Sequence, residues 1–499
     1  MIMTREEFRR AIGLTRTSFE GGHIKAVQTA LQAYHDYKVK DVGNINQQRE
    51  KKERLNALYD ACRAWRTRHV HEEGLKGLDA MKMPVMKYLI EQVAEEMAVM
   101  RKIPRIYRKV QFIGYHIQTA GDLSKPTDGQ KYIGLVDEKK DIQSRCQILA
   151  DAIAAARNDA SLDPHALKIF IAPEFFYRGG QGGAYSIESA SGINAEMDPY
   201  LRDADYGDWI FVLGTAIAHM PVAQKAKDIE MLNLAIVRKG GVEVAKSTEK
   251  DSLIIYKEYV SAIDYLGRFF GKGKEFHSGK TDIAHVGLAN VLGAERTLRP
   301  TDGARDTALV KGNGAPNLPG QKRVWQPSLD QRYKASVEYF DGKISRDEML
   351  RRKKPVSYEI SEESRSGLGG GSLFEMNGYK FALEICLDHA ERRIFSLNPK
   401  KIDFHLVTSC GMSPDNSVAK SGGYLFLVDG INIKKLSVHL LQTAGMTVKT
   451  ISTTSPNIAA PIDMTLASRQ TNFKGAATKL FELGRGRVIL FKPRDCPPD

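Results

Sequence analysis

The N-terminal part of the chain, residues 1–105, places apolar residues among polar ones with the period of a helix. Apolar positions recur there at spacings of three and four, as in Leu55, Leu58, Cys62 and Trp65. This spacing puts them on one face of an amphipathic helix, and residues 81–100 repeat the pattern. We predict a bundle of three to five helices, which could be an interaction module or a buttress for the rest of the protein.

From Lys109 onwards the pattern changes to short apolar runs rich in Val, Ile and Phe. The runs are VQFIGYHIQ, LKIFIAPEFF, WIFVLGTAIA, MLNLAIVRKG, SLIIYKEYV, YKFALEICL and DFHLVTS. A helical stretch at 141–157 separates the first two, so we predict the strands of an α/β domain over residues 106–499. The rhythm breaks down into Gly, Pro and charged residues at about 266–371, which indicates a long insertion in this domain.

Composition excludes several classes of protein. The chain has 499 residues and is 42% hydrophobic, so it can bury a sizeable core. Its mean hydropathy is -0.35, and no apolar run approaches the ~18 residues of a membrane-spanning helix. The N-terminus interleaves charges with apolar residues, unlike a secretory signal. We therefore expect a soluble protein that does not associate with a membrane.

Cysteine usage indicates the cellular compartment, and the distribution of charge bears on nucleic acid as a partner. The 5 cysteines include no CxxC pair, which argues against a disulfide framework and a structural zinc site and favours the cytoplasm. The net charge of +13 is spread among acidic residues, whereas nucleic-acid binding needs basic residues clustered on one face. The one dense basic run, 351–354, is typical of a solvated surface. Nucleic acid is therefore a disfavoured partner.

Three polar residues stand where apolar runs end. Glu174 follows LKIFIAP, Lys257 follows SLIIY, and Cys386 follows FALEI. Each alone has an ordinary structural explanation: a capping carboxylate, a solvated strand end, an inert core thiol. Together they supply a general base, an electrostatic clamp and a nucleophile for acyl transfer.

The segments around these residues resemble signatures of the nitrilase superfamily, the carbon–nitrogen hydrolases. The segments are APEFF, IIYKEYV and EICLDHAERR, in the family's order of Glu, Lys and Cys, and the resemblance extends from about Lys109 to the C-terminus. It implies a four-layer αββα sandwich, a homo-oligomer and no cofactor or metal. The long segment between Lys257 and Cys386 departs from the family pattern and implies an insertion near the mouth of the active site.

The resemblance also implies a mechanism. Glu174 would take the proton of Cys386, and the thiolate would attack an amide or nitrile carbon to form a thioester. Lys257 and the backbone N–H of Leu387 would stabilise the developing negative charge.

Further residues are candidates for the substrate pocket. Phe175, Tyr177 and Arg178 follow Glu174, and Arg178 could bind a substrate carboxylate. Asp264 is the nearest counterpart of an additional Glu that many family members carry after the Lys, and Asp388 could orient the turn after Cys386. His389 lies too close along the chain to Cys386 for a Cys–His dyad to be favoured.

Two other functions use the same residues differently. The first is acyl transfer to an acceptor other than water, or amidase action on a protein side chain, with the helices and the insertion as recognition surface. The second is a non-catalytic binding protein of the same fold, which the intact Glu, Lys and Cys set disfavours. The sequence does not identify the substrate: a small amide or nitrile is expected, with a protein substrate as the alternative.

Overall fold

The chain folds into two compact units, Met1–Arg108 and Lys109–Asp499; the sequence pattern had put the boundary at 105/106. The computed structural model describes residues 2–13, 22–71, 78–119, 135, 137–178, 185–222, 225–247, 251–257, 372–390, 392, 394, 401–431, 437–444, 447–451, 457–464, 480–481 and 484–499. The predicted insertion and Asp264 lie outside these ranges.

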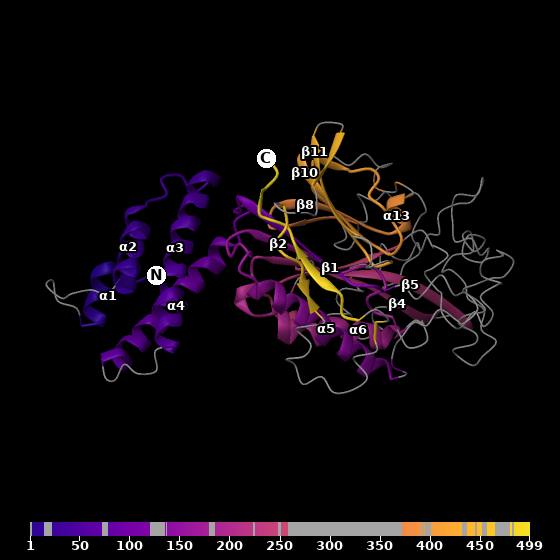
Figure 1. Cartoon of the computed structure of the whole chain (residues 1–499), viewed down its shortest axis with the longest axis horizontal. Coiled ribbons are helices and arrows are strands. Elements are labelled where there is room, and N and C mark those ends of the chain that lie inside the picture. Colours follow the sequence, from indigo (N-terminus) through magenta and orange to yellow (C-terminus); the bar gives the residue numbers. More distant parts are fainter. Residues whose placement is uncertain are drawn as a thin grey trace. The chain divides into compact units, whose positions relative to one another are not determined.

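The first unit is helical, as the apolar spacing predicts. Its described elements are α1 (Arg5–Ala11), α2 (Gly22–Asp36), α3 (Ile45–His71) and α4 (Leu78–Met100), drawn in indigo to violet in Figure 1. α3 packs against both α2 and α4. The stripe of Leu55, Leu58, Cys62 and Trp65 is buried, which confirms the amphipathic reading of this helix.

The second unit contains two mixed β-sheets. In sheet A the order is β13-β14-β1-β2-β4-β5-β6, with β3 beside β4 and β15 beside β1. β1, β2 and β4 are parallel, and β5 and β6 continue the sheet antiparallel. The bounds are β1 Lys109–His116, β2 Leu167–Ile171, β3 Tyr185–Ser186, β4 Trp209–Val222, β5 Lys225–Lys239, β6 Ser252–Tyr256, β13 Ile462–Asp463, β14 Arg487–Leu490 and β15 Arg494–Asp495.

Sheet B has the order β12-β11-β10-β9-β8-β7, with β8, β9 and β10 parallel. Its strands are β7 Leu373–Met376, β8 Tyr379–Ile385, β9 Ile402–Ser409, β10 Ala419–Asp429, β11 Val438–Ala444 and β12 Thr447–Ile451. The sequence analysis predicted β8 and β9 of this sheet but not β7, β10, β11 or β12, and it did not predict β14 of sheet A.

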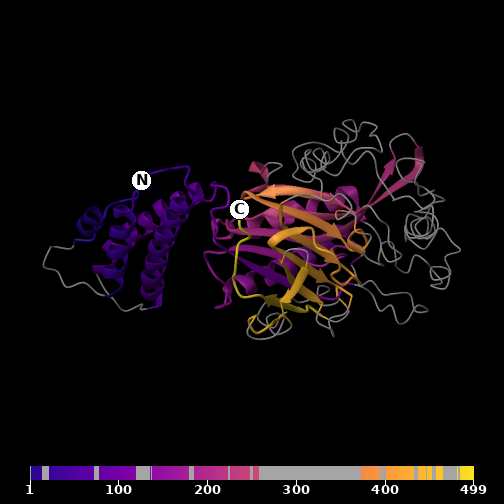
Figure 2. The same ribbon diagram turned by 90° about the horizontal axis from the view of Figure 1, so that it is seen from above.

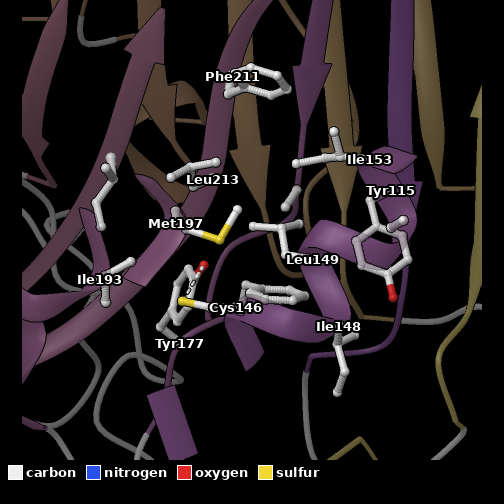
Figure 3. Packing of buried hydrophobic residues seen from close by; sticks show 14 of the residues in the cluster. Tyr115, Cys146, Ile148, Leu149, Ile153, Tyr177, Ile193, Met197, Phe211 and Leu213 are labelled. Atoms are coloured by element: carbon white, nitrogen blue, oxygen red, sulfur yellow. Dashed lines mark hydrogen bonds between the residues drawn. The ribbon is translucent and has the colours of Figure 1, made fainter. Parts of the chain in front are cut away.

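Sheet A has helices on one face and sheet B on the other. The helices α5 (Glu138–Asn158) and α6 (Ile187–Leu201) pack on it through a large apolar cluster. Figure 3 shows this cluster, with Leu149 of α5 and Met197 of α6 beside Leu213 of β4. Sheet B, in orange, lies on the other side of β1 and β2 in Figures 1 and 2.

The side chains of β1 alternate between the helix-covered face of sheet A and the face that packs on sheet B. Tyr115 belongs to the cluster on the helix side, whereas Phe112 packs against Phe404 and Phe426 of sheet B, at ring-centroid distances of 6.0 and 5.1 Å. Successive side chains of a strand point to opposite faces, so β1 is buried between two layers. The short elements η2 (Ala204–Tyr206), η3 (Val244–Lys246) and α13 (Leu387–Ala390) complete the described fold.

The described helices do not meet the length and apolarity needed to cross a membrane.

Candidate active site

Glu174 is buried just beyond the end of β2, and several strands fix its backbone. Its N–H donates to the carbonyl of Ser409 at 3.3 Å, and its carbonyl accepts from Thr119 Oγ1 at 2.6 Å. The next residue, Phe175, has a φ of 61°, and its N–H donates to Thr215 Oγ1 at 2.9 Å. A left-handed backbone is costly for a residue other than Gly, so these bonds determine where the Glu174 side chain points.

Lys257 makes a direct ion pair with Glu174. Its Nζ lies 2.9 Å from Glu174 Oε1, and the two side chains are 2% and 0% exposed. The same carboxylate oxygen accepts a hydrogen bond from Asn233 Nδ2 at 2.9 Å. The backbone carbonyl of Asn233 also accepts the backbone N–H of Lys257 at 2.9 Å. The neighbouring strands β5 and β6 therefore deliver an amide and an ammonium to one buried carboxylate.

Cys386 occupies a tight turn between β8 and α13. It is buried and has a φ of 49°, and β8 ends at Ile385, two residues before the end of the run YKFALEICL. The carbonyl of Cys386 accepts the N–H of His389 at 2.9 Å, as the first turn of α13 begins. This strand, turn and helix present the thiol at the end of the sheet.

The end of β9 links Cys386 to Glu174. The backbone carbonyl of Thr408 accepts the N–H of Cys386 at 3.0 Å, and the Thr408 hydroxyl donates to the carbonyl of Ala172 at 2.9 Å. The next residue, Ser409, accepts the N–H of Glu174. The Sγ of Cys386 lies 3.8 Å from the carbonyl oxygen of Cys410. Adjacent residues of one strand thus hold the segments that carry the carboxylate and the thiol.

Charged side chains of this site also act on the pKa of the Cys410 thiol. Burial raises the pKa of its thiol well above the ordinary value, and the carboxylates of Asp429 and Glu174 add to this effect while Arg178 opposes it. Cys410 therefore stays a neutral thiol at physiological pH, and it contributes its backbone carbonyl to the surroundings of Cys386.

Asp429, at the end of β10, organises the loop that follows β9. Its carboxylate accepts the Ser409 hydroxyl at 2.7 Å, the N–H of Met412 at 2.9 Å and the N–H of Gly411. The sequence analysis did not single out Asp429 or Asn233. Asp429 ends the apolar run YLFLVD as Glu174 ends its own, and Asn233 interrupts an apolar run, so a systematic search for polar residues in or after such runs would have found both.

The remaining predicted pocket residues lie in different surroundings. The centroid of the Phe175 ring lies 4.4 Å from the Arg178 guanidinium and 5.9 Å from Lys257 Nζ. Phe175 and Arg178 therefore lie next to the Glu174–Lys257 pair. The Tyr177 hydroxyl lies 3.7 Å from Cys146 Sγ in the core between sheet A and α5 (Figure 3). Tyr177 therefore contributes to packing on the helix side.

The two candidates that follow the thiol differ in exposure. Leu387 is partly exposed and Asp388 is buried at the start of α13.

Glu384, His389 and His405 form a buried cluster whose ligand atoms lie within 4.8 Å of one another. Glu384 Oε2 is 2.9 Å from both His389 Nδ1 and His405 Nε2. The other ring nitrogens accept backbone N–H groups, from Asp415 at 3.0 Å and from Val418 at 3.3 Å.

These contacts decide between a metal site and a hydrogen-bond network. Since the outer ring nitrogens accept hydrogen bonds, the inner nitrogens carry the hydrogens and donate them to Glu384. A metal ion would need lone pairs on the inner nitrogens, and each outer nitrogen would then be a donor facing an N–H. The bonds from both imidazoles hold the pKa of Glu384 well below its usual range, although burial opposes this. The cluster is therefore an ionised carboxylate held by two neutral imidazoles, and His389 has no ring nitrogen left for a dyad with Cys386.

Comparison of the chain with protein-family models, with curated proteins and with solved structures finds no significant match. The functional argument therefore depends on the chemistry of the site.

Proposed function

We propose that this protein is a carbon–nitrogen hydrolase that cleaves an amide or a nitrile through a thioester on Cys386. The observation that carries the proposal is the buried Glu174–Lys257 pair, linked through the end of β9 to a thiol in a left-handed turn. A buried ion pair costs several kcal/mol per ion in desolvation. Ionisable groups that are buried at this cost and have a specific charge partner are candidates for a functional site.

The proposal includes the αββα sandwich of the nitrilase superfamily. It is supported by the segments that resemble that family's signatures, by the packing of sheet A against sheet B, and by α5 and α6 on the outer face of sheet A. The proposed fold also requires a helical layer outside sheet B.

In the proposed reaction, Glu174 takes the proton of Cys386 as the thiolate attacks the substrate carbon. Lys257 and the backbone N–H of Leu387 stabilise the negative charge that develops on the oxygen or nitrogen of the substrate. With an amide, protonated Glu174 then gives its proton to the leaving amine as the C–N bond breaks, and a thioester forms. With a nitrile, the attack gives a thioimidate, which adds water and loses ammonia to reach the same thioester. Water, activated by Glu174, hydrolyses the thioester and restores the thiol.

The contacts of Glu174 fit this double role. Lys257 and Asn233 both bond to Oε1, so the carboxylate keeps one orientation while its protonation changes. The ammonium of Lys257 is held by the same carboxylate, so the proposed base and the proposed electrostatic clamp keep a fixed position relative to each other. Positioning of this kind avoids reorganisation during the reaction.

The proposal can be tested without knowing the substrate. Alkylation of each cysteine is followed by mass spectrometry against pH in the wild type and in Lys257→Met. Cys386 should react fastest, with an apparent pKa below the ordinary ~8.5 of a thiol, and this advantage should shrink when the cation is removed. Cys146 and Cys410 serve as internal controls, because burial raises the pKa of both thiols. A Cys386 that reacts no faster than these two would refute the proposal.

A screen of amides and nitriles then separates hydrolysis from acyl transfer. Hydrolysis releases a carboxylic acid whether or not an amine acceptor is added. Acyl transfer, the alternative use of the same thioester, gives a new amide in proportion to the acceptor. Cys386→Ala should abolish both products.

A further inference from the structure

The turn at Cys386 requires support from its surroundings. With a φ of 49°, Cys386 is in the left-handed region, which costs a residue with a Cβ on the order of 1–2 kcal/mol. Such a conformation persists only where neighbouring interactions impose it. The position of the thiol therefore depends on whatever holds the chain before and after this residue.

One buried carboxylate bonds to the chain on both sides of the turn. Glu384 lies on β8, two residues before Cys386, and His389 lies on α13, three residues after it. The hydrogen bond from His389 Nδ1 to Glu384 Oε2 at 2.9 Å spans the turn. Glu384 Oε1 accepts the backbone N–H of Ile394 at 2.9 Å, which anchors the chain beyond α13 to the same side chain.

His405 connects this clamp to β9. Its Nε2 lies 2.9 Å from Glu384 Oε2, and its strand pairs in parallel with β8. The outer ring nitrogens of His389 and His405 accept the N–H groups of Asp415 and Val418. These two residues lie in the loop that starts at Cys410 and ends before β10, and the carbonyl of Cys410 lies 3.8 Å from the Cys386 thiol. The network thus fixes both the turn and the nearest part of its environment.

We propose that Glu384 is a positioning residue for the nucleophile, with His389 and His405 as the donors that keep its carboxylate in place. Glu384 acts through the backbone of the Cys386 turn and does not touch the substrate. The inference rests on the proposed function, because it matters for catalysis only if Cys386 is the nucleophile.

The informative variant is Glu384→Gln, which keeps the size of the side chain. Its amide nitrogen would face either both imidazole N–H groups or the backbone N–H of Ile394, donor against donor, so at least one of the bonds that Glu384 accepts around the turn is lost. The matched control is Asp403→Asn. Asp403 is a buried carboxylate on β9, it accepts the N–H of Lys380 at 2.8 Å, and it pairs with Lys420 at 2.8 Å. Asp403 lies near the start of the strand, whereas the Cys386 turn is bonded to its end.

The experiment measures alkylation of Cys386 against pH in the full-length wild type and in both variants, together with their melting temperatures. Both variants should melt earlier than the wild type. Glu384→Gln should also lower the Cys386 rate at pH 7 by about tenfold or more, which corresponds to a rise of about one unit in the apparent thiol pKa. Asp403→Asn should leave the Cys386 profile unchanged. Once a substrate is known, Glu384→Gln should lower kcat with little change in KM.

The outcomes separate the two proposals. A reactive wild-type Cys386 with the same profile in Glu384→Gln would overturn the positioning role and leave the hydrolase proposal intact, and so would an equal effect of Asp403→Asn. An unreactive wild-type Cys386 would overturn both. If Glu384→Gln does not fold, His389→Ala replaces it, because this variant removes the bond across the turn and leaves Glu384 paired with His405. It should lower the Cys386 rate in the same direction, and an unchanged rate would overturn the inference.

Discussion

Replacing Lys257 with Met tests the buried ion pair at the centre of the site. Coulomb's law gives an attraction of about 6 kcal/mol for unit charges at the 2.9 Å separation of Lys257 and Glu174, with an effective dielectric constant of about 20. Desolvation offsets much of this attraction. The cost of Lys257→Met comes instead from the carboxylate left buried without its cation, which amounts to about 3–5 kcal/mol in comparable cases. We expect the lower end, about 3 kcal/mol, because Asn233 still donates to Glu174.

The assay is urea denaturation, with the free energy of unfolding taken from the midpoint and slope. Lys246→Met is the control: its ion pair with Glu243 is 2.6 Å long, but the Lys side chain is 78% exposed, so its loss should cost less than about 1 kcal/mol. The double variant Glu174→Gln/Lys257→Met should be more stable than Lys257→Met alone, because it leaves no uncompensated charge. If Lys257→Met costs no more than the control, the reasoning about this pair is wrong.

Three further predictions address the chemistry, the packing of the sheets and the response to acid. Glu174→Gln should lower kcat about 10²- to 10⁴-fold, the usual contribution of proton transfer, measured once a substrate is found; an unchanged kcat would exclude Glu174 as the base. Gly114→Ala should destabilise the second unit by about 1–3 kcal/mol in urea denaturation, because the new Cβ would lie 2.7 Å from Val438; a neutral effect would mean that the sheets can separate at no cost. The folded state lowers the pKa of Glu384 below 4.5, so its stabilising effect is present above that pH and is lost as the pH falls further. The wild type should therefore lose more stability than Glu384→Gln between pH 5 and pH 3, and parallel losses in an acid titration would contradict this.

Local patterns in the sequence were sufficient to predict a helical first unit and several strands of the second. Helix and strand periods differ, so apolar spacing alone distinguishes Leu55 and Trp65 of α3 from the runs that became β1 and β2. The pattern did not predict β10, β11 and β14. The run YKFALEICL also extends two residues beyond the end of β8, because periodicity carries no information about a left-handed turn.

The sequence by itself determined the candidate chemistry of this protein: a carboxylate, an amine and a thiol, each directly after a buried apolar run. The tertiary structure decided which groups meet. It paired Lys257 with Glu174, added Asn233 to the same oxygen, and turned Tyr177 towards the helices. It also assembled the network around Glu384 from β8, α13 and β9. These contacts join residues that are far apart in the chain or lie on different elements, so strand order and register create them, and no local pattern encodes either.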